Sequence, residues 1–356
     1  MKQRPNKKRQ VTLADIAASA GVATMTVSRV VNQSGYVHPD TRDKVLQVVR
    51  GMNYRRNHLA RALKRQRTDT VGLVLGDIAN PYAAELARAV RERMAEKGFT
   101  LFICVSEHSP KEDVAAFESL TDHRVDGVIV ATRASKLGND RLAQMIEMGI
   151  PVTLLGREFR HPAVDFVGAD HLKGGYEATT HLIKLGHKRI GFIGVSLTNS
   201  LGLKRFQGYV DALREHGLPV EEKLIVGRQE GPDQAPGYST EEMGYEGMKK
   251  LLSRRVRPTA IFARNDFTAI GAIGAIQEAG LRIPDDIAIV GYDDVPLARH
   301  ITPKLTTVRQ PTREQGHLAA EFLLRRIEHD ALAPREEKIL ECELVVREST
   351  ASAPRQ

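Results

Sequence analysis

The stretch that decides the fold of the amino-terminal part is residues 11–32, VTLADIAASAGVATMTVSRVVN. Thr12 followed three positions later by Asp15 predicts a capping box at the start of a helix, with an acidic group where the helix dipole favours it. The apolar residues that follow have the spacing of one buried helical face. Gly21 permits a tight left-handed turn, and a second helix is expected over about residues 24–31.

A third helix is expected to begin at Pro39 and to end at Gly51. Two helices joined by a short turn with glycine are typical of a helix-turn-helix DNA-binding motif, although a helical hairpin gives the same pattern. The charge favours DNA, because residues 1–67 carry 15 Lys/Arg and three Asp/Glu, whereas the rest of the chain carries 37 basic and 41 acidic residues. Such a local field attracts a polyanion. A solvated basic tail is the alternative, but residues 2–9 hold only five of the fifteen basic side chains.

The composition of the whole chain excludes several classes of protein. Its 356 residues suffice for two or three domains with proper cores. No apolar run approaches the 18 residues of a membrane span, and no apolar segment of a secretory signal follows the basic start. Cys104 and Cys342 lie too far apart in the sequence for a disulfide scaffold or a cysteine-based zinc site. We therefore expect a cytoplasmic protein with no cofactor, no metal and no membrane partner.

From residue 70 onward, apolar strands alternate with amphipathic helices. This alternation predicts an α/β fold of parallel sheets with helices on both faces. About 280 residues are too many for one core, so two sheets are expected. One set of strands is expected near 71–75, 101–105, 127–131 and 151–155, and a second set, beginning near 165–168, at 190–193, 259–263 and 287–292.

Polar residues follow several of these strands. In parallel sheets the carboxyl ends of strands are where small ligands bind. Carboxylates, an amide and arginines in such a cleft suit a polyhydroxylated ligand, whose hydroxyls need donors and acceptors. The candidates that follow strands are Asp77, Tyr82, Arg157, Asn265 and Asp293. Two neighbours stay open: Asp266 is either a ligand contact or a helix N-terminal charge, and Asp294 either a ligand contact or a structural turn acid.

The sequence resembles the lactose/galactose repressor (LacI/GalR) family of regulators. The resemblance is carried by residues 11–17 (VTLADIA), 21–22 (GV), 26–32 (TVSRVVN), 41–42 (TR) and 53–63 (NYRRNHLARAL), and it continues through the rest of the chain. It implies a helix-turn-helix head followed by a two-lobed domain of the periplasmic-binding-protein type with two parallel sheets. The implied domains are 1–56 for DNA binding, 57–67 for a hinge helix and linker, and 68–348 for effector binding and dimerisation.

The resemblance also implies which residues meet DNA. In the hinge segment we expect Asn57, Ala60 and Leu63 at the DNA, with Leu63 as an apolar wedge in the minor groove. A linker leucine that packs on the regulatory domain is the alternative. In the head, Thr24, Met25 and Arg29 are expected to read bases, with Arg29 on a guanine and Met25 on a thymine methyl group.

Other polar residues of the head are expected to hold phosphates and so to fix the register without reading bases. They are Thr12, Thr26, Ser28 and Asn32. Ala23 departs from the family pattern, since relatives usually carry a Ser or Thr cap there. One donor at the start of the second helix is therefore expected to lack a side-chain cap.

For the effector, the resemblance matches Asn265 and Asp293 to positions that hold sugar hydroxyls, and Arg205 to an effector-contacting arginine. Arg124 and Tyr238 match ligand-lining positions. Where relatives that bind sugars carry an acid, this chain has Gly156 and Arg157, which together with Arg205 points to an anionic effector such as a sugar acid or sugar phosphate. Arg157 paired with Asp170 or Asp293 is the alternative. The resemblance implies sugar catabolism as the family default, with purine-type corepressors as a kind of exception.

The implied function is sequence-specific regulation of transcription, and repression is the expected effect of DNA binding. A homodimer is expected to bind a palindromic operator in double-stranded DNA, and the effector between the lobes is expected to alter hinge-helix order. Nothing in residues 345–356 resembles the leucine heptads of tetrameric relatives. A solute-binding transport protein of the same two-lobed fold is the alternative. Such a protein carries an export signal and lacks a DNA-binding head, and the sequence predicts the reverse on both counts. An enzyme is not expected, since the motifs GxGxxG after the first strand, GxxxxGK[ST] and GxSxG are absent from the sequence.

Overall fold

The computed structural model describes residues 11–54, 67–157, 159–195, 200–227, 240–328 and 334–353. The chain divides into two compact units, residues 1–68 and 69–356.

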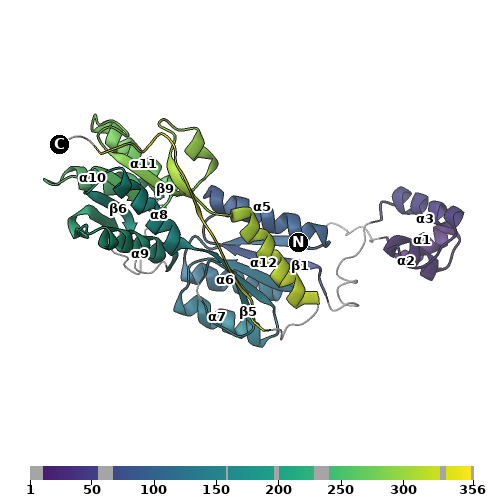
Figure 1. Cartoon of the computed structure of the whole chain (residues 1–356). Helices are drawn as coiled ribbons and strands as arrows, with labels where there is room; N and C mark the ends of the chain where they lie inside the picture. The colour runs from purple at the N-terminus through teal and green to yellow at the C-terminus, as the bar shows by residue number, and fades with distance from the viewer. Residues whose placement is uncertain are drawn as a thin grey trace, which may run out of the picture. The chain divides into compact units, whose positions relative to one another are not determined.

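The first unit contains three short helices, α1 (Leu13–Ala20), α2 (Thr24–Asn32) and α3 (Pro39–Gly51) (Figure 1). The predicted capping box is present: Thr12 Oγ1 accepts from the backbone N–H of Asp15, and the Asp15 carboxylate accepts from the backbone N–H of Thr12. Gly21 ends α1 in the left-handed conformation, with φ of 63°. Eight buried residues form the core between the helices: Ile16, Ala17, Ala20, Val27, Val30, Val31, Val37 and Val45.

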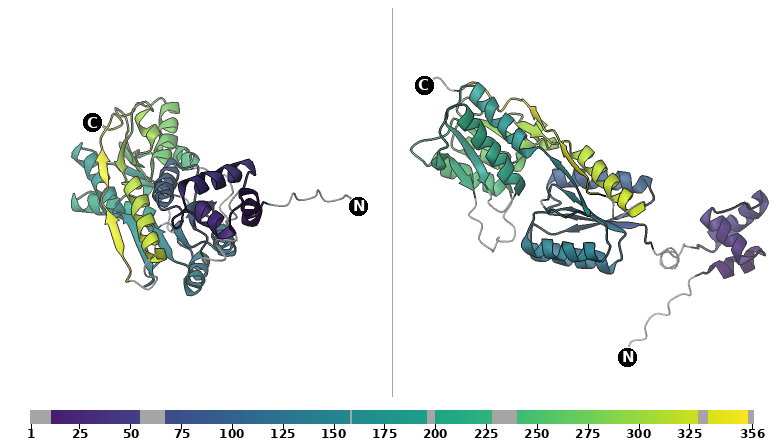
Figure 2. Two further views of the ribbon diagram at one scale, coloured as in Figure 1. Left: turned by 90° about the vertical axis from the view of Figure 1, so that its right-hand side faces the viewer. Right: turned by 60° about the horizontal axis from the view of Figure 1, so that its bottom comes forward.

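The second unit contains two six-stranded sheets, and Figure 2 shows them as separate lobes. The sheet of lobe 1 is parallel throughout, in the order β11 (Glu337–Leu340), β5 (Val164–Ala169), β4 (Val152–Leu155), β3 (Gly127–Ala131), β1 (Thr70–Leu75) and β2 (Thr100–Val105). The sheet of lobe 2 has the order β12 (Glu343–Val345), β10 (Thr306–Arg309), β9 (Ala288–Asp293), β8 (Ala260–Ala263), β6 (Ile190–Val195) and β7 (Ile225–Gly227), with only β12 antiparallel to its neighbour.

Helices cover both faces of each sheet, as continuous apolar strands require. In lobe 1, helices α5 (Pro81–Glu96) and α12 (Thr312–Glu328) pack on one face, and α6 (Pro110–Asp122) and α7 (Lys136–Glu147) on the other. In lobe 2, α8 (His171–Lys184) and α9 (Ser200–Glu215) pack on one face, and α10 (Thr240–Leu252) and α11 (Asp266–Glu278) on the other. Short 3-10 helices η1 (Glu222–Leu224) and η2 (Pro296–Arg299) complete lobe 2.

The boundary between the two sets of strands differs from the prediction. The strand expected to open the second set is β5, which pairs with β4 and β11 in lobe 1. The chain crosses to lobe 2 after β5, at Asp170, returns to lobe 1 between β10 and α12, and crosses again between β11 and β12. Figure 2 shows this last segment, in yellow, running from one lobe to the other. The edge strands β11 and β12 of the two sheets therefore come from late in the chain, and the local sequence pattern does not indicate which sheet each of them joins.

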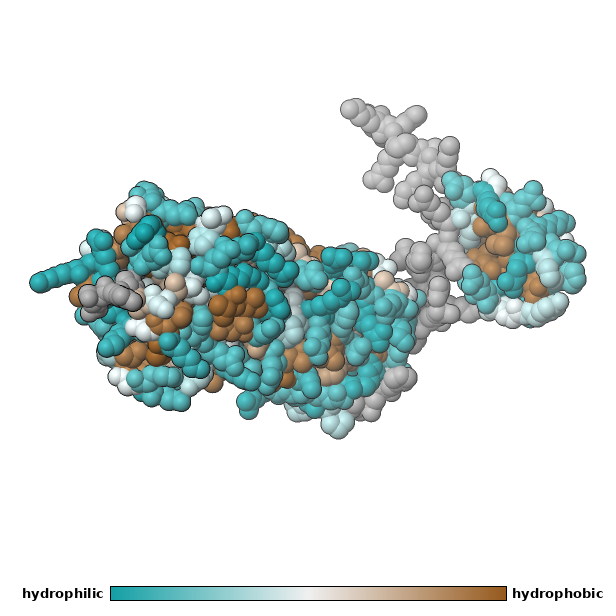
Figure 3. Space-filling model, turned by 45° about the horizontal axis from the view of Figure 1, so that its top comes forward, coloured by the Kyte–Doolittle hydropathy of each residue, from teal (hydrophilic) through white to brown (hydrophobic). Residues whose placement is uncertain are grey.

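The surface of the second unit is mixed. Figure 3 shows a mainly hydrophilic face interrupted by patches of hydrophobic side chains. The edge strand β2 is more exposed than the continuous apolar run predicts, since Phe102, Ile103 and Val105 are 40%, 46% and 38% exposed. Among the described residues, the helices are too short or too polar to cross a membrane.

A buried ion pair joins α12 to β5 in lobe 1. The guanidinium of Arg326 donates from Nε and Nη2 to the two carboxylate oxygens of Asp165, both at 2.6 Å, and both side chains are 1% exposed. The backbone N–H of Glu336 donates to the same carboxylate. Since both charges are out of water, removal of one leaves the other buried without its main counter-charge.

We predict that Arg326→Ala lowers the free energy of unfolding of the chain by about 3–5 kcal/mol. Arg88 of α5, which is 64% exposed and pairs with Glu92 in the same lobe, is the control. Arg88→Ala is expected to cost about 1 kcal/mol or less, because surface pairs contribute little. Urea unfolding followed by circular dichroism measures both. Equal, small losses for the two variants would contradict the importance of the buried pair.

Candidate functional site

A cavity of about 1000 Å³, part of it open to solvent, lies between the two lobes. In lobe 1 its walls come from the segments that follow β1, β2, β3 and β4 and from α5. In lobe 2 they come from the ends of β8 and β9 and from the first turns of α9 and α10. Its polar or charged lining residues are Asp77, Asn80, Tyr82, His108, Thr132, Arg133, Arg205, Thr240, Arg264, Asn265 and Asp293.

The topology of the two sheets explains why these residues meet. In lobe 1, β1 lies between β2 and β3, and in lobe 2, β6 lies between β7 and β8. At such a point the connections leave the sheet toward opposite faces, which opens a crevice at the carboxyl ends of the strands. Both crevices face the same cavity, so the ligand-binding edge of each sheet forms one wall of it.

Arg205 is the central side chain of the lobe 2 wall. Its guanidinium pairs with the Asp293 carboxylate at 3.3 Å and donates from Nη1 to the backbone oxygen of Arg264 at 2.7 Å. It also lies 3.7 Å from the centre of the Tyr292 ring, and Nε donates to Nδ1 of His171 at 3.3 Å. This planar group is therefore held on several sides and presents a fixed cationic surface to the cavity.

Asp293 is shared between Arg205 and the segment that joins the lobes. Gln310 Nε2, between β10 and α12, donates to Asp293 Oδ1 at 2.7 Å. Burial raises the pKa of Asp293 above its usual value, while the positive charge of Arg205 opposes that rise. The Asp293 carboxylate is thus a hydrogen-bond acceptor for a ligand. It is itself hydrogen-bonded to a segment that crosses between the lobes.

Asn265 has one half of its amide occupied. Its Oδ1 accepts from the backbone N–H of Thr268 at 2.9 Å and so caps α11. The side chain is buried at the cavity wall, which leaves the NH₂ group as the donor that a ligand oxygen can meet. The structural role and the predicted ligand role therefore use different atoms of the same side chain.

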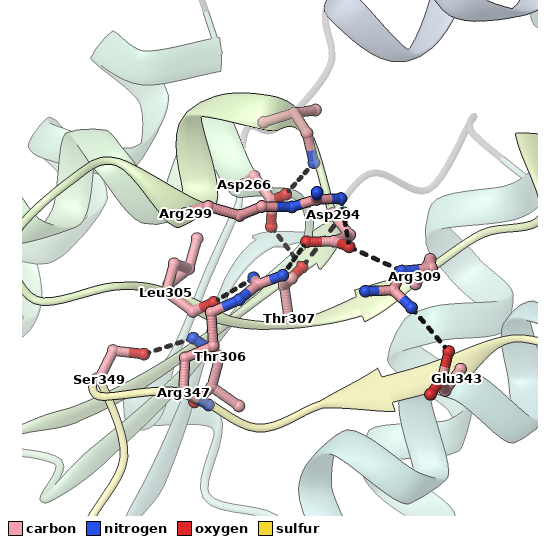
Figure 4. Close-up of polar contacts among 11 residues, drawn as sticks. Asp266, Asp294, Arg299, Leu305, Thr306, Thr307, Arg309, Glu343, Arg347 and Ser349 are labelled. Carbon is pink, nitrogen blue, oxygen red and sulfur yellow. Dashed lines mark hydrogen bonds and ion pairs between the residues drawn. The ribbon is translucent and has the colours of Figure 1, made fainter.

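The end of β9 is held in an unusual conformation. Asp293 and Asp294 have φ of 108° and 52°, a region that L residues rarely adopt. The Asp294 carboxylate is the acceptor for three arginines, Arg299, Arg309 and Arg347, and Figure 4 shows them converging on it. This network fixes the turn that directs Asp293 into the cavity.

The two aspartates left open by the sequence are both structural. Asp266 Oδ2 accepts from the backbone N–H of Val295 at 2.8 Å, and Oδ1 accepts from the hydroxyl of Thr307 (Figure 4). Burial, and then the charge of Asp293, raise the pKa of Asp266 well above its usual value. Asp294 is occupied by its arginines. Neither Asp266 nor Asp294 lines the cavity.

Asp77 and Tyr82 line the lobe 1 wall as the sequence led us to expect. Asp77 Oδ1 accepts from the backbone N–H of Ala79 at 2.8 Å, which shapes the turn after β1. The hydroxyl of Tyr82 lies 3.1 Å from Gln315 Oε1 of α12. Both side chains keep atoms at the cavity while they fix their own segments.

Two of the predicted cleft residues lie elsewhere. Arg124 is exposed between α6 and β3, at the amino end of that strand and so at the opposite edge of the sheet from the cavity. Arg157 is 1% exposed and donates to Asp113, Thr132 and Asn139 inside lobe 1. Burial lowers the pKa of Arg157, and the charge of the Asp113 carboxylate opposes this shift. The acidic partner of Arg157 is therefore Asp113, and neither Asp170 nor Asp293, the two alternatives from the sequence. Tyr238 lies outside the described residues.

Three cavity residues with basic side chains were missed: His108, Arg133 and Arg264. Each stands shortly after a strand, namely β2, β3 and β8, so the rule of carboxyl ends, applied to every strand, would have found them. Arg157 contributes indirectly to this set, because its Nη1 donates to the backbone oxygen of Arg133 and so holds the segment that carries this residue.

In the first unit, the predicted base-reading side chains are exposed on one helix. Thr24, Met25 and Arg29 are all exposed on α2, and Met25 is 65% exposed although it is apolar. Ala23 makes no side-chain cap at the start of α2, as expected. Thr26 and Val27 donate from their backbone N–H groups to the oxygen of Ala23, so the N–H groups of Thr24 and Met25 are the ones that a phosphate or water can meet.

The predicted phosphate contacts have mixed surroundings. Asn32 Nδ2 donates to Ser28 Oγ at 3.2 Å, and Thr26 is half-buried on the same helix. The hydroxyl of Thr12 also donates to the Asp15 carboxylate and so is already occupied by the helix cap. The hinge residues Asn57, Ala60 and Leu63 lie outside the described residues.

Comparisons with known proteins agree with this geometry. A family model described as bacterial regulatory proteins, lacI family, matches residues 12–57, and one described as a periplasmic binding protein-like domain matches residues 179–350. The chain is 36% identical to the HTH-type transcriptional repressor PurR of Mannheimia succiniciproducens, over 95% of this chain and 98% of that one. It is 37% identical to the HTH-type transcriptional regulator DegA of Bacillus subtilis, over 96% and 98%.

Solved structures extend the likeness to the whole architecture. The lac repressor dimer bound to operator and the anti-inducer ONPF aligns with a TM-score of 0.82 at 27% identity, over 96% of this chain and 100% of that one. The complex of the transcriptional regulator CelR with cellobiose aligns with a TM-score of 0.71 at 32% identity, over the same shares. The chain therefore belongs to the LacI family of bacterial regulatory proteins and is a transcriptional regulator whose DNA binding is controlled by a small-molecule effector.

Proposed function

We propose that the chain represses transcription as a homodimer on a palindromic operator, and that a carbohydrate-derived effector in the cleft sets its affinity for that operator. The observation that carries the proposal is the cavity between the lobes, with hydrogen-bonding groups from both, in a chain whose first unit exposes α2. The relatives support repression and a carbohydrate ligand, since PurR is named a repressor and CelR is named in complex with cellobiose.

In this proposal the chain is organised in three parts. Residues 1–56 bind DNA, residues 57–67 form the hinge helix and linker, and residues 68–348 bind the effector and dimerise. Asn57, Ala60 and Leu63 contact the operator, with Leu63 as the minor-groove wedge. The effector changes the angle between the lobes, and coupling of this kind typically amounts to about 1–3 kcal/mol.

The proposal involves no catalytic step and no cofactor. Within the part of the chain that the structure describes, no group of three or more His, Cys, Asp or Glu side chains is arranged to hold a metal ion. We place the protein in the cytoplasm, because its DNA is there. A solute-binding transport protein is disfavoured by the family match of residues 12–57.

Dimerisation is supported by the exposed apolar edge of lobe 1. An edge strand with uncovered apolar side chains is prone to pair with another chain. Phe102 and Ile103 point to opposite faces of β2 because successive residues of a strand alternate. A two-fold symmetric partner that covers this edge removes both side chains from water.

Arg29→Ala tests the reading surface on α2. We expect a loss of about 1–3 kcal/mol on the preferred operator, confined to one or two base positions, because arginine reads guanine with two hydrogen bonds. The operator is first selected from random duplex DNA, and fluorescence anisotropy then gives the affinity for each single-base variant. Arg50→Ala, which removes an exposed charge at the end of α3, is the control and should lower affinity equally for all sequences. A uniform loss with Arg29→Ala would make it a phosphate contact.

Ile103→Glu tests the dimer. Two-fold symmetry places the new charge in the interface twice, so we expect the dimer dissociation constant to rise about 100-fold or more. Sedimentation velocity measures the oligomeric state of the full chain. Leu137→Glu, at a residue of α7 that is 49% exposed, is the matched control and should leave the dimer intact. A dimer that survives Ile103→Glu would place the interface elsewhere.

A further inference from the structure

Two of the three segments that cross between the lobes lie side by side. The first follows β5 and reaches α8 at His171, and the third joins β11 to β12 through Glu341 and Cys342. The backbone N–H of Asp170 donates to the oxygen of Leu340 at 2.8 Å, which continues the pairing of β5 with β11. Residues 170–171 and 341–342 are the paired crossovers. Because they are joined, they bend together when one lobe turns against the other.

The hydroxyl of Tyr292 lies where the paired crossovers enter lobe 2. It is 3.1 Å from Nδ1 of His171 and 3.3 Å from Sγ of Cys342. Tyr292 stands in β9, between β8 and β10 of the lobe 2 sheet, and its side chain is fully buried. One oxygen atom that belongs to lobe 2 therefore contacts the ends of both crossovers.

The protonation of these side chains fixes the direction of their hydrogen bonds. Nε of Arg205 donates to Nδ1 of His171 at 3.3 Å, so this nitrogen is an acceptor. Burial, and then the charge of Arg205, lower the pKa of His171 well below its usual value, which keeps the ring neutral. Burial raises the pKa of Tyr292 and the pKa of Cys342, so both keep their hydrogens. The hydroxyl of Tyr292 therefore donates to His171 and accepts from the thiol of Cys342.

Packing holds the Tyr292 hydroxyl in this position as well. A Cβ on Gly174 of α8 would lie 2.5 Å from the Tyr292 oxygen and 3.1 Å from Cε2 and Cζ of the ring, so α8 leaves room for the hydroxyl and for nothing larger. The guanidinium of Arg205 lies 3.7 Å from the centre of the ring. A ring enclosed in this way keeps one position, because close-packed neighbours resist its displacement.

Arg205 connects the Tyr292 hydroxyl to the cavity. It lines the cavity, and it shares Nδ1 of His171 with that hydroxyl. A ligand that draws the guanidinium away leaves the nitrogen to Tyr292 alone, because an accepting imidazole nitrogen has one lone pair. Occupation of the cavity therefore changes the bond that holds the first of the paired crossovers.

We propose that Tyr292 is a positioning residue whose hydroxyl holds the lobe 2 end of the paired crossovers and so confines the bending between the lobes to Asp170 and Glu341. Without this hydroxyl the bending spreads to His171 and Cys342, and the lobes adopt a wider range of angles. This inference rests on the proposed function only for its effect on operator binding.

Tyr292→Phe tests the role of the hydroxyl, because it keeps the ring that supports Arg205. Amide hydrogen exchange of the full chain, followed by mass spectrometry of short peptides, measures local opening at residues 169–174 and 338–345. We expect exchange there to be about tenfold faster than in the unmodified chain, since the bonds that hold a segment set its local opening. Exchange in α6 and α7 of lobe 1 should stay the same. An unchanged rate at the paired crossovers overturns the proposal.

Tyr209→Phe is the matched control. Tyr209 is also fully buried, in the same apolar core of lobe 2, and its hydroxyl donates to the backbone oxygen of Ile190 at 2.8 Å, inside the lobe. Each variant loses one buried hydroxyl, so a general loss of stability affects both alike. An equal rise in exchange at the paired crossovers in the two variants would show general loosening and would overturn the proposal.

Cys342→Ala removes the thiol that donates to the Tyr292 hydroxyl, and it should speed exchange at the paired crossovers by itself. Combined with Tyr292→Phe it should add little, because the second substitution then removes a bond that is already lost. Fully additive effects of the two substitutions would show that the side chains act separately and would overturn the proposal.

Operator affinity separates this inference from the proposed function. The dissociation constant of the selected operator is measured by fluorescence anisotropy without effector for the unmodified chain and for both Phe variants. A change of about threefold or more in Tyr292→Phe, absent in Tyr209→Phe, supports the positioning role and control of DNA binding through the lobes. A loss of affinity makes the unliganded angle the DNA-binding one, and a gain makes it the other angle. Faster exchange with an unchanged operator affinity supports the positioning role and counts against control through the lobes.

Discussion

The guanidinium of Arg205 joins the parts of the molecule on which an effector must act. It binds Asp293, the last residue of β9, and it contacts His171, the first residue of α8 after the chain crosses between lobes. The Tyr292 hydroxyl, beneath the guanidinium, lies 3.1 Å from His171 Nδ1 and 3.3 Å from the thiol of Cys342, which belongs to another crossover. Gln310, in the remaining crossover, donates to Asp293. A ligand at Arg205 or Asp293 therefore acts on groups bonded to all three connections between the lobes.

Each lobe has buried ion pairs of its own. In lobe 1 Arg157 pairs with Asp113 and Arg326 with Asp165, and in lobe 2 Asp294 holds three arginines. Breaking the Arg157–Asp113 or the Arg326–Asp165 pair is costly because the remaining charge stays buried. The segments between the lobes are short and few, so a change of angle between two intact lobes is the motion that the fold permits at least cost.

The sequence allowed much of the fold to be predicted, because local signals mark local structure. Thr12, Asp15 and Gly21 set the start and the end of α1, and the apolar spacing gave the core of the first unit. The assignment of β5 to the second sheet was wrong. Strands near a crossover have no local signal for the sheet that they join, and only the pairing of β5 with β4 and β11 decides it.

The site was predicted less completely, and for a related reason. The rule that ligands meet the carboxyl ends of parallel strands brought Asp77, Tyr82, Asn265 and Asp293 to one cavity, and the family resemblance added Arg205. It also selected Arg157, because the rule gives a strand end but not the direction of a long side chain. In the structure that side chain turns away from the cavity to Asp113, a residue 44 positions earlier. Partners so distant in sequence become visible only when the helices are packed.

The most direct test of the account is the affinity for the operator with the cleft occupied and empty. A screen of sugars, sugar acids and sugar phosphates identifies the compound that most raises the melting temperature, and fluorescence anisotropy then measures operator binding with and without that compound at saturation. The account predicts a change in the dissociation constant of about 5- to 150-fold, the usual range of coupling between two sites, and no change in an Asn265→Ala Asp293→Ala variant. Saturation of the cleft with an unchanged operator affinity would contradict it.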